Sequence, residues 1–327
     1  MSSNQHVNLS RGLRRACKEG QLGVVRAHLA AGADANGGWT ENSAPLPLPS
    51  PLHYASCRGY EAVCRLLLEH GADPNIAADR CAPPLNNACS DEDVRRACAM
   101  ATLLLDFGAD IEATDDRGRT PLIRACRRIE LTTTSNVELV TLLLDRGANI
   151  LKGDPHTPLW HAVDNGKLQV VNLLLQRGAT ADNGFDPSHP QKNSGRLDTW
   201  GMNPAFVTPL YNRLRSSSPL ARQTPPLARL LLAHGASFDR EHRVFDRRSR
   251  DPSRVVRRDT PLSLVRSISP AMGGIMRELN ELFDAYLQHH WKLRVRLRVF
   301  GPVSEHLLDL HVAPFVIGDG VLSKKRS

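Results

Sequence analysis

The residues in this chain best suited to chemistry are its seven cysteines and thirteen histidines. A metal site would need several of them, or acidic residues, at short spacings such as Cys-x-x-Cys or His-Glu-x-x-His, because all ligands must converge on one ion. Neither pattern occurs in the sequence. Cys17, Cys89 and Cys126 each follow an alanine, and this shared position favours packing over a redox-sensitive thiol. The sequence therefore predicts no metal site.

The remaining motifs give no sign of catalysis. The pairs His289–His290 and His306 with His311 lack acidic or cysteine neighbours, so we expect them to be solvated or to end a helix. The chain contains no Gly-x-Ser-x-Gly turn, no phosphate-binding Gly-Lys-Ser/Thr and no dinucleotide fingerprint. These absences predict a protein that is not an enzyme and that binds no cofactor.

Positive charge is concentrated in one segment of a chain whose net charge is +8. Residues 240–258 hold eight arginines against three acidic residues, and basic residues recur in residues 292–298. Such a surface favours an acidic peptide, a phosphate-rich partner or nucleic acid, or serves nuclear import, and a solvated loop is the alternative. The absence of interleaved aromatic residues counts against nucleic acid. The arginines assigned to this basic patch are Arg247, Arg248, Arg257, Arg258, Arg294 and Arg296.

An internal repeat must position these residues. Three stretches align without gaps, and each runs from an alanine to a Gly-Ala pair sixteen residues on, with a glycine four residues in. They are residues 16–32, 55–71 and 162–178. Agreement at fixed spacing is the mark of a repeat architecture.

Each repeat has the pattern of two short helices. Ser50 or Thr157 can cap the first helix, and Pro51 or Pro158 can occupy its first turn without losing a hydrogen bond. The second helix carries apolar residues three and four apart and ends at a glycine such as Gly71. Neither helix can bury its apolar side alone, so neighbouring units must stack. The sequence therefore predicts an all-α solenoid of helix-turn-helix units.

This pattern resembles the ankyrin repeat, a unit of about 33 residues with a Thr-Pro-Leu-His-x-Ala signature. The segments at residues 51–55, 83–88, 120–125 and 157–162 match it well, and those at 208–212 and 260–262 match more weakly. The resemblance covers residues 10–290, with seven units that begin near residues 10, 50, 83, 120, 157, 208 and 260. It implies that His53, at the signature position, bridges backbone groups of neighbouring units. The third and fourth units are longer, which predicts longer connections between their helices.

The resemblance also implies a curved stack whose concave face is lined by the first helices and the hairpin tips. Large amphipathic side chains there would be natural contacts for a partner, because Tyr, Trp and Arg dominate interface energies. For Trp160 the alternative is packing between units, and for Trp39 it is packing within its own loop. The candidate partner contacts are Trp39, Tyr54, Asn87, Arg124, Trp160, His161 and Asn212.

Several segments depart from the repeat. We expect residues 1–9 to be disordered, residues 181–207 and 239–259 to be loop insertions, and a capping helix to end near residue 290. Residues 291–327 form a basic tail of unknown fold, in which residues 291–299 alternate apolar and basic residues as a strand does.

Composition places the chain among folded proteins inside the cell. Its hydrophobic content is 41%, no apolar run approaches the roughly 18 residues of a membrane span, and the polar start is unlike a signal peptide. An odd number of cysteines fits a reducing compartment, cytoplasmic or nuclear. We therefore expect a monomeric, non-catalytic module or adaptor that binds another protein.

Overall fold

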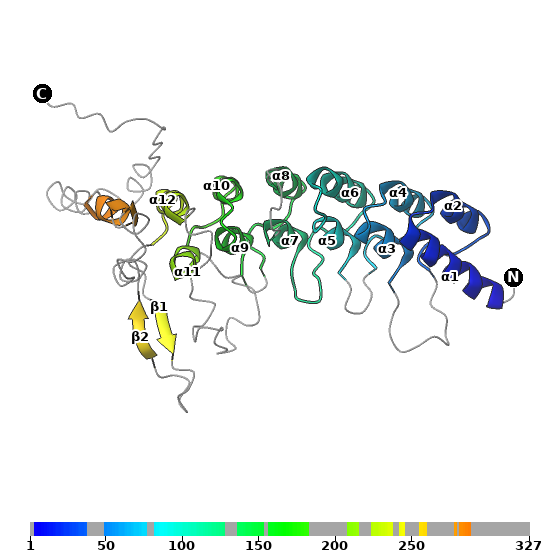
Figure 1. Cartoon of the computed structure of the whole chain (residues 1–327), viewed down its shortest axis with the longest axis horizontal. Helices are drawn as coiled ribbons and strands as arrows, with labels where there is room; N and C mark the ends of the chain where they lie inside the picture. The colour runs from blue at the N-terminus through cyan, green and yellow to red at the C-terminus, as the bar shows by residue number, and fades with distance from the viewer. Residues whose placement is uncertain are drawn as a thin grey trace, which may run out of the picture.

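The computed structural model of the chain describes residues 3–37, 49–76, 82–127, 136–153, 156–182, 208–215, 224–237, 242–245, 255–259, 278–279 and 281–288. Within these ranges six helix pairs follow one another, and a two-stranded sheet and a further helical stretch at residues 281–288 come after them. The pairs stand side by side in a single row, with the first helices in one layer and the second helices in the other (Figure 1). The prediction of an all-α repeat solenoid is confirmed for the repeated part.

The helices of the two layers have the following bounds. The first helices are α1 (Ser3–Glu19), α3 (Pro51–Cys57), α5 (Pro84–Ala88), α7 (Pro121–Arg127), α9 (Pro158–Asp164) and α11 (Pro209–Arg215). The second helices are α2 (Leu22–Ala30), α4 (Glu61–Glu69), α6 (Val94–Asp106), α8 (Val137–Asp145), α10 (Leu168–Gln176) and α12 (Thr224–Ala233).

Hydroxyl side chains cap four of the first helices, as the sequence predicts. The Ser50 hydroxyl accepts a hydrogen bond from the His53 backbone N–H at 3.1 Å. The hydroxyls of Thr120, Thr157 and Thr208 each accept a hydrogen bond from the backbone N–H of the residue three positions later, at 3.3, 3.4 and 3.3 Å. Each capping residue is followed by a proline, which has no backbone N–H that would need a partner in the first turn.

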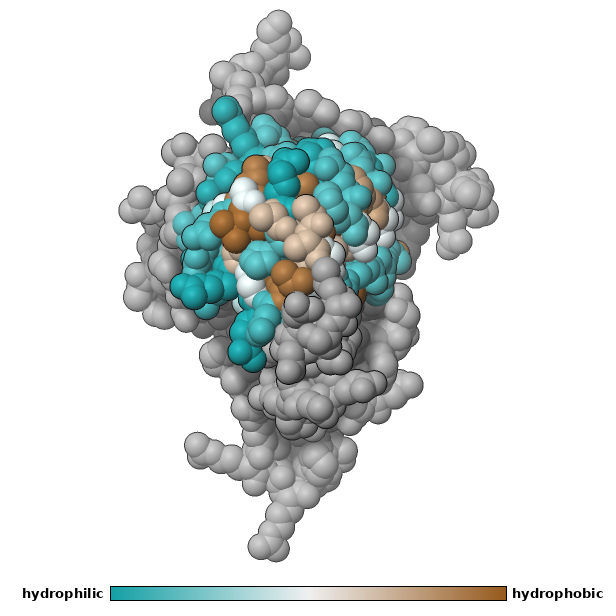
Figure 2. Space-filling view, turned by 90° about the vertical axis from the view of Figure 1, so that its right-hand side faces the viewer, coloured by the Kyte–Doolittle hydropathy of each residue, from teal (hydrophilic) through white to brown (hydrophobic). Residues whose placement is uncertain are grey.

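A single continuous core runs through the stack. It is built from the signature leucines of the first helices and from the consecutive leucines of the second helices, which face neighbours on two sides. At the end of each second helix a glycine adopts a positive φ, 82° at Gly71, and lets the chain turn out of the helix. The first pair closes one end, where polar residues dominate the described surface with a few hydrophobic residues among them (Figure 2).

Polar side chains also link successive units at the turn after each second helix. The Asn36 side chain accepts a hydrogen bond from the Asp73 N–H at 2.8 Å and donates one to the Gly71 carbonyl at 3.4 Å. Asn75 makes the same two bonds one unit later, to Asp110 and Gly108, at 2.7 and 3.0 Å. Glu112 and Asp182, at equivalent positions, accept from the N–H groups of Asn149 and Ser237, both at 2.7 Å. We call these four residues the linking residues.

Two expectations about the irregular segments are corrected. Residues 3–9, expected to be disordered, belong to α1, because no glycine or proline lies between Ser3 and the buried Ser10 to interrupt the helix. The insertion 239–259, expected to be a loop, contains strands β1 (His242–Phe245) and β2 (Val255–Asp259), paired antiparallel with an irregularity between Val244 and Phe245. The valines and the phenylalanine of this insertion favour β-strands, a preference that the prediction of a charged loop did not include.

The third unit takes up its extra residues in an unexpected way. Helix α6 has 13 residues where α4 has 9, so the second helix is lengthened as well as the connection before it. In the fourth unit the connection between α7 and α8 is longer, as predicted, and Asn136 at its end donates to the Ala125 carbonyl at 3.0 Å.

The last described helical stretch agrees with the predicted capping helix. Residues 278–279 and 281–288 are helical, and the side chains of Leu279 and Phe283 are buried in the continuous core. Among the described residues no helix is both long and apolar enough to cross a membrane. The residues of the 291–299 strand prediction lie outside the described ranges.

Candidate functional site

The candidate contacts on the first helices other than Trp160 occupy one repeated position, which precedes the signature alanine or, in α11, Arg213. Four of them, on α3, α5, α7 and α11, are partly exposed, whereas the residue before each of them is buried. They are Tyr54, Asn87, Arg124 and Asn212. The structure therefore places these four predicted residues along one side of the stack, at the surface.

The fifth unit reverses this arrangement. Trp160 is partly exposed, and His161, which we expected to be accessible, is only 3% exposed. The Trp160 ring stacks on His156, with 3.9 Å between ring centroids and 8° between planes, and this contact holds it at the surface. His161 turns into the stack instead, where its Nδ1 lies 3.3 Å from the guanidinium of Arg127. Burial and the nearby Arg127 charge lower the pKa of His161 well below its ordinary value, so the ring is neutral and accepts this bond.

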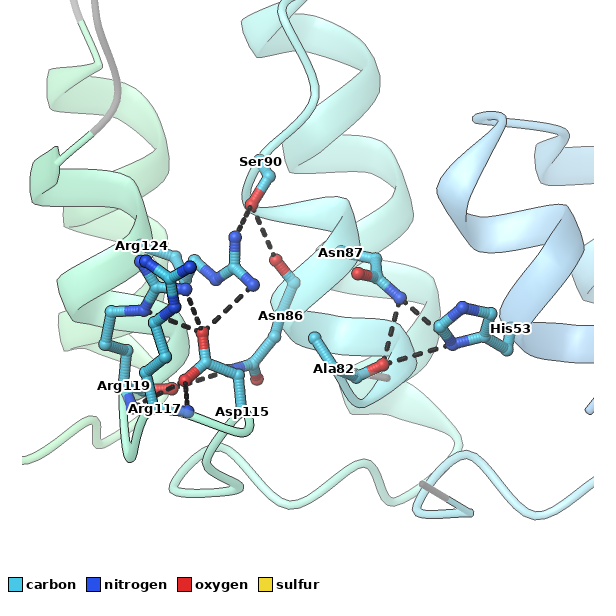
Figure 3. A network of polar contacts seen from close by, with 9 residues as sticks. All are labelled: His53, Ala82, Asn86, Asn87, Ser90, Asp115, Arg117, Arg119 and Arg124. Carbon is cyan, nitrogen blue, oxygen red and sulfur yellow. Dashed lines mark hydrogen bonds and ion pairs between the residues drawn. The ribbon is translucent and has the colours of Figure 1, made fainter. Parts of the chain in front are cut away.

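His53 bridges two units, as the family resemblance implies. Its Nδ1 lies 3.1 Å from the carbonyl oxygen of Ala82, which belongs to the next unit (Figure 3). The Asn87 amide donates to the same carbonyl at 3.0 Å, and the Cys57 thiol lies 3.5 Å from the other ring nitrogen. The Asn87 amide nitrogen also lies 3.2 Å from Nδ1 of His53. Asn87 therefore uses one of its donors within its own unit, on the carbonyl that His53 of the preceding unit also contacts.

Arg124 is also tied into the stack, through a buried carboxylate. The side chain of Asp115 is 0% exposed and lies 2.8 Å from the guanidinium of Arg119 and 3.0 Å from that of Arg124 (Figure 3). The other carboxylate oxygen accepts the backbone N–H groups of Arg117 and Arg119, both at 2.9 Å. Arg124 reaches the preceding unit as well, donating to the Ser90 hydroxyl at 3.3 Å.

The electrostatics of Asp115 follow from these contacts. Burial alone raises the pKa of its carboxyl group, but the hydrogen bonds from the N–H groups of Arg119 and Arg117 and the charge of Arg124 outweigh burial and lower the pKa. The carboxylate therefore stays ionised and fixes the hairpin tip to α7.

The sixth unit is anchored in a similar way. The Asn212 amide donates to the Asp164 carboxylate at 3.0 Å, and the guanidinium of the buried Arg213 donates to the Asp164 carbonyl at 2.9 Å. Tyr54 and Trp160, in contrast, are partly exposed, and their rings contact only the histidines His53, His156 and His161 among the aromatic contacts of the described residues.

Tyr54 borders a pocket that the sequence interpretation missed. This open pocket has a volume of about 660 Å³ and is lined by Arg14, Arg15, Lys18, Glu19, Tyr54, Arg58 and Tyr60. The available signal was the spacing of Arg11, Arg14, Arg15 and Lys18, which places four basic side chains on one face of a helix.

The remaining predicted residues have a more limited description. Trp39, Arg247, Arg248, Arg294 and Arg296 lie outside the described residues. Arg257 and Arg258 belong to β2, where the register places Arg258 opposite Arg243 and Arg257 opposite Val244. The insertion therefore carries three of its arginines on a paired β-hairpin.

The three cysteines predicted as packing residues, Cys17, Cys89 and Cys126, are buried. Burial raises the pKa of Cys17, Cys89 and Cys126 to about 12 in each case, so their thiols are protonated at neutral pH. No group of three or more His, Cys, Asp or Glu side chains within the described ranges is arranged to hold a metal ion.

Comparisons with known proteins agree with this geometry. A family model of three ankyrin repeats matches residues 85–185, and a single-repeat model matches residues 50–79. The crystal structure of the human ASB11 ankyrin repeat domain is similar to this chain, with a TM-score of 0.56 and 25% sequence identity, covering 83% of this chain and 96% of that one. No curated protein matches the sequence. The stacked helix pairs, the bridging histidine, the capped Thr-Pro starts and the family matches together show that residues 50–79 and 85–185 are ankyrin repeats.

Proposed function

We propose that the chain is a non-catalytic module, acting as a monomer inside the cell, that binds another protein along the exposed side of its first helices. Ankyrin repeats are generally protein-interaction modules. The observation that carries the proposal is the pair of partly exposed aromatic side chains on that side, Tyr54 on α3 and Trp160 on α9. Aromatic side chains with a polar atom combine large contact area with low conformational cost, which makes them common anchors at interfaces.

The double variant Tyr54→Ala with Trp160→Ala tests the assignment of this surface. Partners are first identified by affinity purification of the full chain with mass spectrometry, and the variant is then compared with Phe107→Ala. Phe107 is a matched control, because it is 40% exposed and lies at the end of α6 in the other layer. We expect the double variant to lose the partner and the control to keep it. Equal retention by both variants would refute the assignment.

The same purification tests whether the module is an adaptor. A version of the chain that ends at residue 290 keeps the repeats and removes the basic tail. If a second set of partners disappears with the tail while the first set remains, the chain brings two proteins together. If every partner remains, the repeats do all the binding and the adaptor role is wrong.

A second candidate function rests on the β-hairpin. Antiparallel pairing of β1 with β2 holds the backbone of Arg243, Arg257 and Arg258 in one small sheet, a fixed platform for an acidic or phosphate-rich partner or for nucleic acid. Such binding would fall steeply with salt, because each neutralised phosphate releases counterions. Titration of labelled RNA and DNA at increasing salt, with the wild type and with Arg257→Ala plus Arg258→Ala, is the measurement. Absent or salt-independent binding would remove this candidate.

A further inference from the structure

The pocket at the junction of the first two units is lined by an unusual combination of side chains. Helix α1 supplies Arg14, Arg15, Lys18 and Glu19, and α3 and the turn after it supply Tyr54, Arg58 and Tyr60. Four side chains are therefore basic, one is acidic and two are tyrosines. This combination of guanidinium, ammonium and phenol groups presents many hydrogen-bond donors and a surplus of positive charge to anything that enters.

The charge of Glu19, the one acidic side chain of the pocket, is already neutralised by a neighbouring residue of α1. Glu19 pairs with Arg15 at 3.0 Å and also accepts a hydrogen bond from the Gln21 amide at 2.9 Å. Arg14, Lys18 and Arg58, in contrast, form no hydrogen bond or ion pair with any residue that the structure describes. Arg14 and Lys18 are four residues apart on one helix, where like charges repel each other. Three basic side chains at one opening thus have no counter-charge among the residues that the structure describes.

The aromatic walls are held in place by neighbouring groups. The Tyr60 ring lies directly against Gly20, where an added Cβ atom would come within 2.7 Å of the ring. Gly20 also has a φ of 71°, so two independent reasons favour glycine under this ring. The Tyr54 ring meets His53 edge to face, with centroids 6.0 Å apart, and His53 is itself fixed to Ala82. Both rings are therefore positioned before any ligand arrives, which lowers the entropy cost of binding.

We propose that this pocket binds an acidic segment of a partner protein, one that carries neighbouring Asp or Glu carboxylates. Guanidinium groups pair with carboxylates through two parallel hydrogen bonds, and the tyrosines supply contact area for the segment between the charges. The proposal deepens the proposed function, because Tyr54 belongs both to the exposed side of the first helices and to this pocket. It also gives that surface a chemical preference at its N-terminal end.

Fluorescence anisotropy with the full chain tests the proposal. The probe is a short labelled peptide of alternating Glu and Ser, and the comparison peptide has Gln in place of Glu. We expect the Glu peptide to bind and the Gln peptide not to bind. The triple variant Arg14→Glu, Lys18→Glu, Arg58→Glu should weaken binding by about a hundredfold or more, because each reversal replaces an attraction with a repulsion.

Matched controls distinguish binding in this pocket from a general attraction of the peptide to basic residues on the surface. Arg26→Glu with Arg95→Glu changes exposed arginines on α2 and α6, outside the pocket, and should leave affinity nearly unchanged. Tyr54→Ala alters no charge, yet it should weaken binding by about tenfold if the ring contacts the peptide. Equal losses in the control and the triple variant, or no effect of Tyr54→Ala, would overturn the proposal.

The source of the negative charge is tested with a third peptide, in which Gln replaces Glu and every serine is phosphorylated. If only this peptide binds, the pocket recognises phosphate and the carboxylate proposal is wrong. Circular dichroism melts of each variant exclude loss of folding as a cause. A failure here leaves the proposed function intact, because the partner purification with Tyr54 and Trp160 variants does not depend on the peptide.

Discussion

At the scale of single residues, the stack depends on a few buried polar groups whose partners come from a neighbouring segment. Asp115 is the clearest case, since its carboxylate joins a hairpin tip to the first turn of α7 through two arginines and two backbone N–H groups. A carboxylate in this position is stable only while all of its partners are present. The same arginine that seemed free to meet a partner, Arg124, is one of those partners.

The variant Asp115→Ala should lower the free energy of unfolding by about 3 kcal/mol, because it leaves Arg119 and Arg124 poorly solvated without a counter-charge. Asp145→Ala is the control, since it breaks the exposed pair with Arg177, whose side chains are 59% and 38% exposed. That change should cost at most about 0.5 kcal/mol. Urea denaturation measures both, and equal effects would contradict the structural role of Asp115.

His161 should make stability depend on pH. Burial first, and then the Arg127 charge, lower the pKa of the folded-state ring below the ordinary 6.5. Below pH 6.5 the unfolded chain therefore binds a proton that the folded chain does not, so the contribution of His161 is fully present above that pH and is lost as the pH falls. Thermal melts across this range should show the loss, and His161→Gln should reduce it. The same substitution at the exposed His234 is the control for the loss of an imidazole as such.

At the scale of elements, four of the first helices start from a hydroxyl cap followed by proline. Ser50→Ala should lower the free energy of unfolding by about 1 kcal/mol, because the His53 N–H loses its acceptor. Ser50→Thr should retain stability, since threonine makes the same bond in three other units. Chemical denaturation of both variants is the measurement, and a Thr variant as unstable as the Ala variant would contradict the capping assignment.

The elements also show how far the sequence could predict this molecule. The helix pairs were predictable, because the proline start and the Gly-Ala end are local signals that act within a few residues. The added turns of α6 and the pairing of β1 with β2 were not, because composition alone did not distinguish a longer connection from a longer helix, or a charged loop from a hairpin.

The candidate site was predicted less completely than the fold. The spacing of the repeats predicted the repeated surface position. It did not predict that Trp160 would be partly exposed and His161 buried, an arrangement that goes with the stacking of Trp160 on His156. Such a contact leaves no periodic pattern in the sequence. The basic pocket is lined by residues of two units, on α1 and on α3 with the turn after it. The pattern of one helix in the sequence shows only the residues of that helix and not the pocket.

At the scale of the whole molecule, stability is a sum of units and their interfaces. Phe283→Ala removes a fully buried ring near the end of the described core. It should therefore loosen the last described units by about 3 kcal/mol while leaving the first ones unchanged. Hydrogen exchange with mass spectrometry should show faster exchange in α12 and no change in α4. Uniform acceleration along the chain would mean that the stack unfolds as one block.

The linking residues do not join every pair of neighbouring units. Asn36, Asn75, Glu112 and Asp182 each fasten one unit to the next, but Leu151 stands at the equivalent place in the fourth unit, and its side chain has no polar atom. The fourth and fifth units are joined instead by the packing of α7 against α9 and of α8 against α10, and by the side-chain contacts of Arg127 with His161 and of Arg177 with Asp145. At this junction the angle between neighbouring units is therefore held by helix residues, whereas at the other four it is held at the turn as well.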